Sequence, residues 1–218
     1  MHPQGAGPGP KNKSAAVPPT TDDEIREKYL ERAIRELNDL GHDLSSCRDC
    51  PRGSVMPVQG SGHPQADIFM LKYRATPSEI EEGVAFYGRA GNALMKSFKR
   101  LSIDPIVVFG TLCVKCPLTD ADAASESCIE RIVEEIGIVQ PRIVVVMGED
   151  ALATLNRLDM PLADEVEATE GEIQRLTPTI DALYVPDIDS SLDEVSAKQR
   201  FWSSFRALGE WYDQLPPY

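Results

Sequence analysis

The sequence predicts an α/β fold, a three-layer α/β/α sandwich around a central four-stranded and mainly parallel sheet. Four short apolar runs are the expected strands, and they lie at 66–71, 106–110, 143–147 and 182–185. The second and third runs are rich in β-branched residues with almost no polar alternation, which is typical of strands buried on both faces. Helical patterns separate the runs, at 89–102, 126–138 and 149–158. Strands that alternate with helices indicate parallel pairing in a layered domain.

The chain is expected to begin and end its folded part with a helix. Acidic residues after Thr21 favour a helix start there, and Gly41 is expected to end this first helix. Apolar residues at helical spacing predict one packed face, formed by Ile25, Tyr29, Ala33, Leu37 and Leu40. The last helix covers 196–215 and places Phe201, Phe205, Leu208 and Tyr212 on one face.

Residues 1–20 are expected to form a disordered leader, and residues 21–218 one folded domain. The leader is rich in Gly, Pro, Ala and Ser, and it lacks the apolar stretch of a secretory signal. No run approaches the ~20 apolar residues that a transmembrane helix needs. We therefore expect no membrane contact and a cytoplasmic location, where clustered cysteines serve as metal ligands more often than as disulfides.

Loops at the carboxyl ends of the expected strands are the natural place for a site. They cover 72–91, 111–128 and 186–195. The formal net charge of −13 repels phosphate on average, so any binding to DNA must come from a local basic patch. An acidic surface equally favours a protein partner.

Five cysteines carry the clearest chemical signal, and four thiolates suit either zinc or a [4Fe–4S] cluster. Two C-x-x-C pairs, Cys47 with Cys50 and Cys113 with Cys116, give a zinc-ribbon interpretation that leaves Cys128 over. The alternative combines Cys47, Cys50, Cys116 and Cys128, with Cys113 as a buried thiol that continues a strand. Spacing alone leaves both open.

Several stretches occur in an order that resembles the iron–sulfur uracil-DNA glycosylases of the family 4 type. They are "CRDCPRGSVMPVQGSGHPQADIFML", "AFYGRAGNALMKSFKRLSI", "GTLCVKC" with a later cysteine, and "PRIVVVMGEDALATL". The resemblance covers roughly residues 45–212. It implies a structural [4Fe–4S] cluster in the domain, with Cys47, Cys50, Cys116 and Cys128 as its ligands and Cys113 outside it.

The same resemblance implies which positions handle the base. Phe86 matches the aromatic residue that stacks on uracil, and Gly88, Arg89 and Gly91 open the next helix as a plausible phosphate seat. Three usual motifs are replaced. Where the family has a glycine-containing loop after the first strand, this chain has "LKYRAT". Leu112 stands in place of the asparagine that reads the uracil edge, and Asp187 is the best match to the catalytic histidine.

These replacements argue against uracil excision by the usual route and leave several hypotheses. A glycosylase with altered chemistry could use Asp187 or Asp189 as base or cation stabiliser, and Lys72 as a Schiff-base nucleophile. A non-enzymatic relative would bind DNA or a protein partner, with the cluster as a structural staple. The basic patch for DNA would draw on Lys72, Tyr73, Arg74, Arg89, Lys96, Lys99, Arg100 and Lys115. The third hypothesis is an unrelated zinc-ribbon protein.

Overall fold

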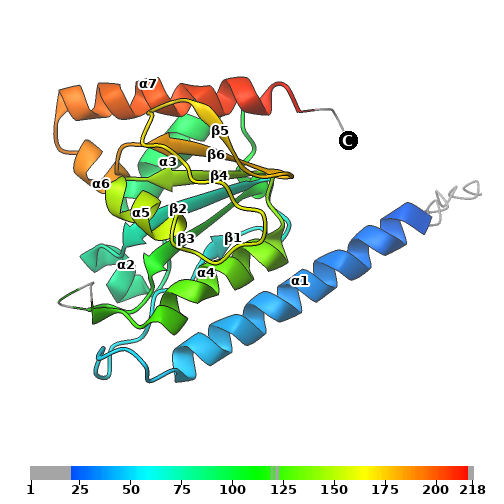
Figure 1. Cartoon of the computed structure of the whole chain (residues 1–218), viewed down its shortest axis with the longest axis vertical. Coiled ribbons are helices and arrows are strands. Elements are labelled where there is room, and N and C mark those ends of the chain that lie inside the picture. Colours follow the sequence, from blue (N-terminus) through cyan, green and yellow to red (C-terminus); the bar gives the residue numbers. More distant parts are fainter. Residues whose placement is uncertain (1–20, 119, 121–122, 216–218) are drawn as a thin grey trace, which may run out of the picture.

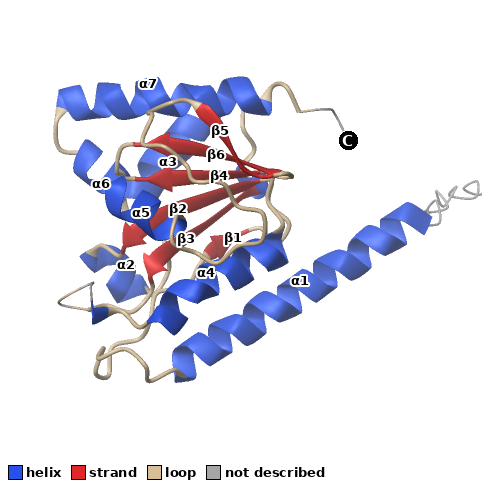
Figure 2. Cartoon of the chain, in the orientation of Figure 1, coloured by secondary structure: helices blue, strands red, loops and turns tan. Residues whose placement is uncertain are grey.

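The computed structural model describes residues 21–118, 120 and 123–215, and the expected leader at 1–20 lies outside this range. The described chain forms three layers, with helices on both faces of a central sheet (Figures 1 and 2). This confirms the α/β/α sandwich. No helix of the described ranges is long and apolar enough to cross a membrane.

The sheet has six strands in the order β1-β3-β2-β4-β6-β5, so the expected count of four is wrong. The four expected strands form its parallel core: β2 (Ile68–Arg74), β3 (Val108–Val114), β4 (Ile143–Met147) and β6 (Ile180–Val185). The two others, β1 (Ser61–Gly62) and β5 (Ile173–Thr177), are antiparallel edge strands. Neither has the continuous apolar pattern of a strand buried on both faces, so a search for such runs does not predict them.

Strand β3 begins later than expected and runs further. Pro105–Val107 forms a 3-10 helix, η1, in which Asp104 accepts the backbone N–H of Ile106 at 3.0 Å. The strand therefore starts at Val108 and includes Cys113, which is fully buried. The expectation that Cys113 continues this strand is confirmed.

Seven α-helices surround the sheet in the described part of the chain. They are α1 (Thr21–Ser46), α2 (Pro77–Glu82), α3 (Arg89–Arg100), α4 (Glu126–Val139), α5 (Glu149–Leu155), α6 (Ile188–Ser191) and α7 (Val195–Tyr212). One core lies between the sheet and α1, α4 and α5, and the other lies between the sheet and α3, α6 and α7. The short helices α2 and α6 were not expected, and they lie within the predicted loops.

Helix α1 does not end at Gly41. The helix continues to Ser46 because Leu44 is buried, and the Gln59 side chain donates a hydrogen bond to the Gly41 carbonyl at 3.1 Å. Only its C-terminal half packs against the domain, since Ile25 and Tyr29 are 46% and 60% exposed. The N-terminal half extends away from the sheet (Figure 1).

Candidate functional site

A cleft of about 1140 Å³ opens at the carboxyl ends of β2, β4 and β6. Its walls come from the two predicted loops at 72–91 and 186–195 and from the first turn of α5, and Leu118 adds a contact from the third loop. Open α/β sheets bind their ligands at this position. The structure therefore brings the three predicted loops together.

The cleft carries more carboxylates than cations. Its acidic residues are Glu149, Asp150, Glu170, Asp187, Asp189 and Asp193, and its basic residues are Arg74, Arg89 and Arg200. Arg89 pairs with Asp193 at 2.9 Å, and Arg200 pairs with Glu170. A surface of this charge disfavours a DNA phosphate backbone.

Lys72, at the end of β2, has no exposed side-chain surface. Its Nζ lies 2.7 Å from Oε2 of Glu79 in α2 and 2.6 Å from Oδ2 of Asp189 in α6. A buried ammonium is tolerated when carboxylates pair with it and accept its hydrogen bonds. The structure thus joins two of the predicted catalytic residues, Lys72 and Asp189, in one ion-pair network.

Glu79 is a member of this network that sequence reasoning missed. Its carboxylate also accepts the backbone N–H of Thr76 at 2.7 Å, the Thr76 hydroxyl at 2.8 Å and the backbone N–H of Phe86. The available signal was the stretch "TPSE", which reads as the capping box of a helix that begins with proline. Helix α2 begins there with that capping box in place.

Asp187 and Asp189 have different surroundings. Asp187 is the N-cap of α6, and its Oδ1 accepts the backbone N–H of Ser190 at 2.8 Å. Burial raises the pKa of Asp189, while its hydrogen bond with Lys72 opposes that shift. Asp187 therefore has a local structural role, whereas Asp189 links α6 to β2.

Phe86 has an unusual backbone and a crowded ring. Its φ of 60° is stabilised by the hydrogen bond from its N–H to Glu79. A Cβ on Gly110 would lie 2.5 Å from the ring, so β3 approaches Phe86 closely. The Lys72 ammonium lies over the same ring, 5.4 Å from its centroid. The ring is thus held between β3 and a buried cation.

The glycines of "FYGRAG" have packing reasons. Gly88 caps α3 with a φ of 85°, a conformation that glycine adopts readily. A Cβ on Gly91 would lie 1.9 Å from the Phe86 carbonyl oxygen, so only glycine allows this close approach. Arg89 is exposed and donates to Asp193 and to the Leu192 carbonyl. The assignment of these residues to a phosphate seat stays a prediction.

The remaining predicted base-site residues divide between the cleft and the interior. Tyr73 and Arg74 line the cleft, and Tyr73 also packs against a core cluster. Leu112 is completely buried in a small cluster with Val58 and Ala85. The position expected to read a base edge is therefore part of the described core.

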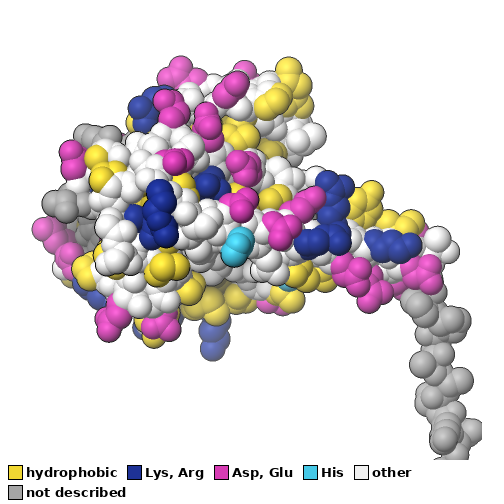
Figure 3. All heavy atoms as spheres, turned by 90° about the horizontal axis from the view of Figure 1, so that it is seen from below, with side chains coloured by type: hydrophobic (Ala, Val, Ile, Leu, Met, Phe, Trp, Pro, Cys, Tyr) yellow, Lys and Arg dark blue, Asp and Glu magenta, His cyan; other side chains and the backbone are white. Residues whose placement is uncertain are grey.

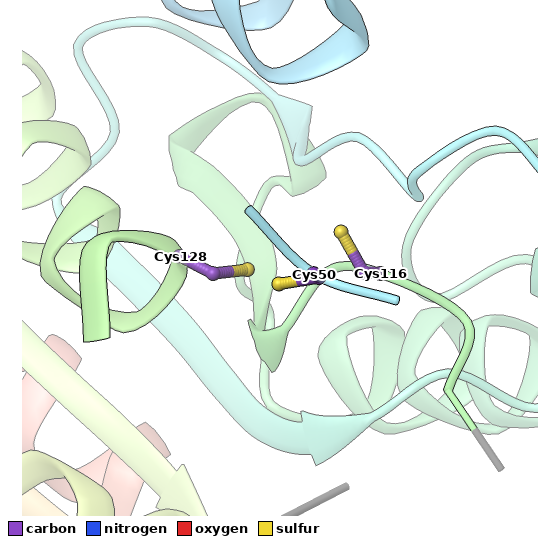
Figure 4. Close-up of side chains that lie close together, drawn as sticks. All are labelled: Cys50, Cys116 and Cys128. Atoms are coloured by element: carbon purple, nitrogen blue, oxygen red, sulfur yellow. The ribbon is translucent and has the colours of Figure 1, made fainter. Parts of the chain in front are cut away.

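Three of the four cysteines predicted as ligands lie together. The Sγ atoms of Cys50, Cys116 and Cys128 are all within 4.8 Å of one another (Figure 4). They come from the loop after α1, the segment after β3 and the first turn of α4, and all three are buried. Cys47 is half-buried and lies outside this group, three residues before Cys50.

The geometry of the cysteines contradicts the zinc-ribbon pairing. That pairing uses Cys113 and leaves Cys128 over, whereas the sulfur group contains Cys128 and not Cys113. Burial raises the pKa of the Cys113 thiol to about 12. In contrast, hydrogen bonds from the Cys116 thiol and from the Lys115 backbone lower the pKa of Cys128. The hydrogen bond with Cys128 and burial raise the pKa of Cys116, so the thiolate, the form that binds metal, is favoured at Cys128 and not at Cys116.

Two buried basic residues support the cysteine region. Arg52 donates to the carbonyls of Ser45 and Cys47 at 2.9 and 3.0 Å, and so fixes the loop of the first cysteine pair. The Lys115 ammonium lies 2.8 Å from the Glu135 carboxylate inside the domain. Lys72 and Lys115 are therefore not part of an exposed basic patch, contrary to the expectation for such a patch.

Comparison with known proteins identifies the fold family. The family model described as "Uracil DNA glycosylase superfamily" matches residues 60–205, which include all six strands of the described sheet. The type-4 uracil-DNA glycosylase of Pyrobaculum aerophilum is 27% identical over 145 residues, which cover 63% of this chain and 73% of that protein. The chain belongs to the uracil DNA glycosylase superfamily and is family 4-like.

Proposed function

We propose that this chain acts in DNA metabolism as a family 4-like protein that recognises DNA and does not excise uracil by the family's usual route. The observation that carries the proposal is the Lys72 ion-pair network. Lys72 and Glu79 have no exposed side-chain surface, and the Lys72 ammonium lies over the ring of Phe86. A base that stacked on that face of the ring would have to displace a cation that two carboxylates hold in place.

The surroundings of Phe86 support the same proposal. Leu112 has no hydrogen-bonding group with which to read a base edge, and it is buried. Asp187 stands where the resemblance implies a histidine, and a carboxylate there would repel the anion of a departing uracil. A second, apolar pocket of about 510 Å³ lies between Phe86, Gly110 and α3. The described walls of this pocket and of the cleft do not include Lys72, Glu79 or Leu112.

We further propose that Cys47, Cys50, Cys116 and Cys128 hold a [4Fe–4S] cluster with a structural role. Three buried sulfurs within 4.8 Å of one another supply three of the four thiolate donors that such a cluster needs. Cys47, which is half-buried and lies three residues before Cys50, would complete the four ligands, whereas Cys113 is fully buried in β3. A cluster would connect the loop after α1, β3 and α4, which are distant in sequence. Brown colour, iron content and the absence of zinc would test this assignment.

An excision assay tests the main proposal. Anaerobically purified protein in excess would be incubated with single- and double-stranded oligonucleotides that contain uracil, hypoxanthine, xanthine or an alkylated base. We expect binding to DNA at low salt and no abasic product from uracil. Uracil excision that is lost in Asp189→Asn would overturn the proposal and indicate catalysis by this network. A borohydride-trapped adduct that is lost in Lys72→Met would indicate a Schiff-base mechanism.

A second candidate function rests on the charge of the cleft. Six carboxylates against three arginines suit a cationic protein segment better than DNA. In this alternative the chain is a catalytically inactive relative that binds a protein partner. Absence of DNA binding at low salt, together with saturable binding of a lysine-rich peptide that Glu149→Gln with Asp150→Asn abolishes, would favour it.

A further inference from the structure

A second groove, on the other side of Arg89 from the cleft, is formed by α3, α6 and the start of α7. It encloses about 510 Å³, within the range of about 300–1,000 Å³ that is typical of ligand sites. On α3, the groove-lining residues Arg89, Asn92, Lys96 and Arg100 recur at helical spacing and so form one face. Lys198 and Trp202 face them from α7.

The charge of this groove is opposite to that of the chain. Four cations line it, namely Arg89, Lys96, Arg100 and Lys198, and its described lining contains no carboxylate. Arg89 pairs with Asp193 at the rim, but Lys96, Arg100 and Lys198 form no ion pair with a described residue. In a chain of net charge −13, this local excess of positive charge attracts an anion.

Aromatic side chains form part of the groove. Phe201 and Trp202 lie in its wall, and Trp202 is only half-buried. The Arg100 guanidinium lies 5.5 Å from the centroid of the Trp202 ring. Arg100 could contact a phosphate while a neighbouring base stacks on the Trp202 ring. Cations beside aromatic rings are typical of grooves that bind single-stranded nucleic acid.

We propose that the groove between α3 and α7 binds the backbone of single-stranded nucleic acid, with Lys96, Arg100 and Lys198 on phosphates and Trp202 as the stacking surface. This inference rests on the proposed function and places its DNA contact outside the acidic cleft. An acidic protein segment would also meet the cations, but the half-buried indole beside Arg100 adds a surface on which a base can stack. The aromatic surface therefore favours nucleic acid.

The test measures binding of a fluorescent oligothymidylate of about twelve nucleotides, a length within known site sizes. The groove variant combines Lys96→Gln, Arg100→Gln and Lys198→Gln. The control variant combines Arg26→Gln, Lys28→Gln and Arg35→Gln, which remove the same charge from exposed positions on α1. Both signs of charge alternate along that projecting helix (Figure 3). Circular dichroism melts would check that both variants fold.

The expected result is a salt dependence that changes only in the groove variant. Each phosphate contact on a single strand contributes about 0.7 to the slope of log K against log salt, so loss of three contacts lowers that slope by about 2. Trp202→Ala should weaken binding roughly five- to 150-fold. The control variant should keep the slope of the unmodified protein.

Other outcomes overturn the inference in distinguishable ways. If the unmodified protein binds the oligonucleotide and the groove variant has the same slope, the groove assignment fails while the proposed function stands. If no binding occurs at low salt, the proposed function fails as well. If a polyglutamate peptide competes as strongly as the oligonucleotide, or if Trp202→Ala binds normally, the groove is an anionic-protein contact and the nucleic-acid assignment is wrong.

Discussion

The cleft and the groove lie side by side, share Arg89 and Leu192, and have opposite charge. The cleft is at the strand ends, where this fold places a site, but it is acidic, and the nearby Lys72 ammonium is buried against Glu79, Asp189 and the Phe86 ring. The groove lies between α3, α6 and α7, is lined by basic residues, and has the Trp202 indole in its wall. Neither the net charge nor the usual position of the site in the fold therefore locates the surface for DNA by itself.

The largest effect is expected at the cysteines, which adjoin the cleft and not the groove. Leu118 packs against the three buried sulfurs and also lines the cleft. Cys128→Ser should remove most of the iron and most of the soluble folded protein, because metal binding and folding are coupled. Iron analysis and circular dichroism would measure this.

Cys113→Ala is the matched control, since Cys113 is equally buried but lies outside the sulfur group. The Cys113→Ala variant should keep its iron, and its free energy of unfolding should fall only because packing contacts are lost. Equal iron in Cys128→Ser and the unmodified protein would contradict the assignment of the cluster.

The next largest effect is expected at the buried ion-pair network of Lys72. Lys72→Met leaves Glu79 and Asp189 without their cation, and breaking a buried pair in this way costs about 3–5 kcal/mol. Urea unfolding would measure the change in the free energy of unfolding. Arg74→Met, on an exposed position of the same strand, should change it by less than about 0.5 kcal/mol. Similar values for the two variants would mean that Lys72 is not paired in solution.

A smaller effect is expected from the negative charge of the cleft. Glu149 and Asp150 are exposed in the cleft, so Glu149→Gln with Asp150→Asn removes negative charge without disturbing the core. Oligonucleotide affinity should rise by no more than about tenfold, through long-range attraction that salt screens. Fluorescence anisotropy at two salt concentrations would test this. A gain that persists at high salt would indicate direct contact of DNA with the cleft.

The smallest effect is a pH dependence at Asp189. Burial raises its pKa in the folded state above the value of about 3.9 in the unfolded chain. Protonation therefore favours the folded form, and this contribution is present below the unfolded pKa and is lost as pH rises through the folded pKa. The unfolding free energy of the unmodified protein relative to Asp189→Asn should fall across the weakly acidic range. A difference that is independent of pH in urea titrations would contradict this shift.

The parallel core was predictable because buried strands leave a continuous apolar pattern, as in "IVVVM" of β4. Edge strands leave no such pattern, so β1 and β5 were missed. The four expected cluster ligands could be chosen only from the resemblance to the family 4 glycosylases, since spacing alone did not decide between Cys113 and Cys128. The pairing of Lys72 with Asp189 is a contact between distant segments, and no local pattern specifies it. The groove likewise depends on how α3 and α7 pack.

Hydrogen–deuterium exchange with and without a single-stranded oligonucleotide tests the central contrast most directly. We expect slower exchange in α3 and the first turns of α7, with the 72–91 and 186–195 loops little changed outside their overlap with those helices. Protection of the two cleft loops, with 92–100 and 198–202 unaffected, would contradict it and would place DNA at the strand ends.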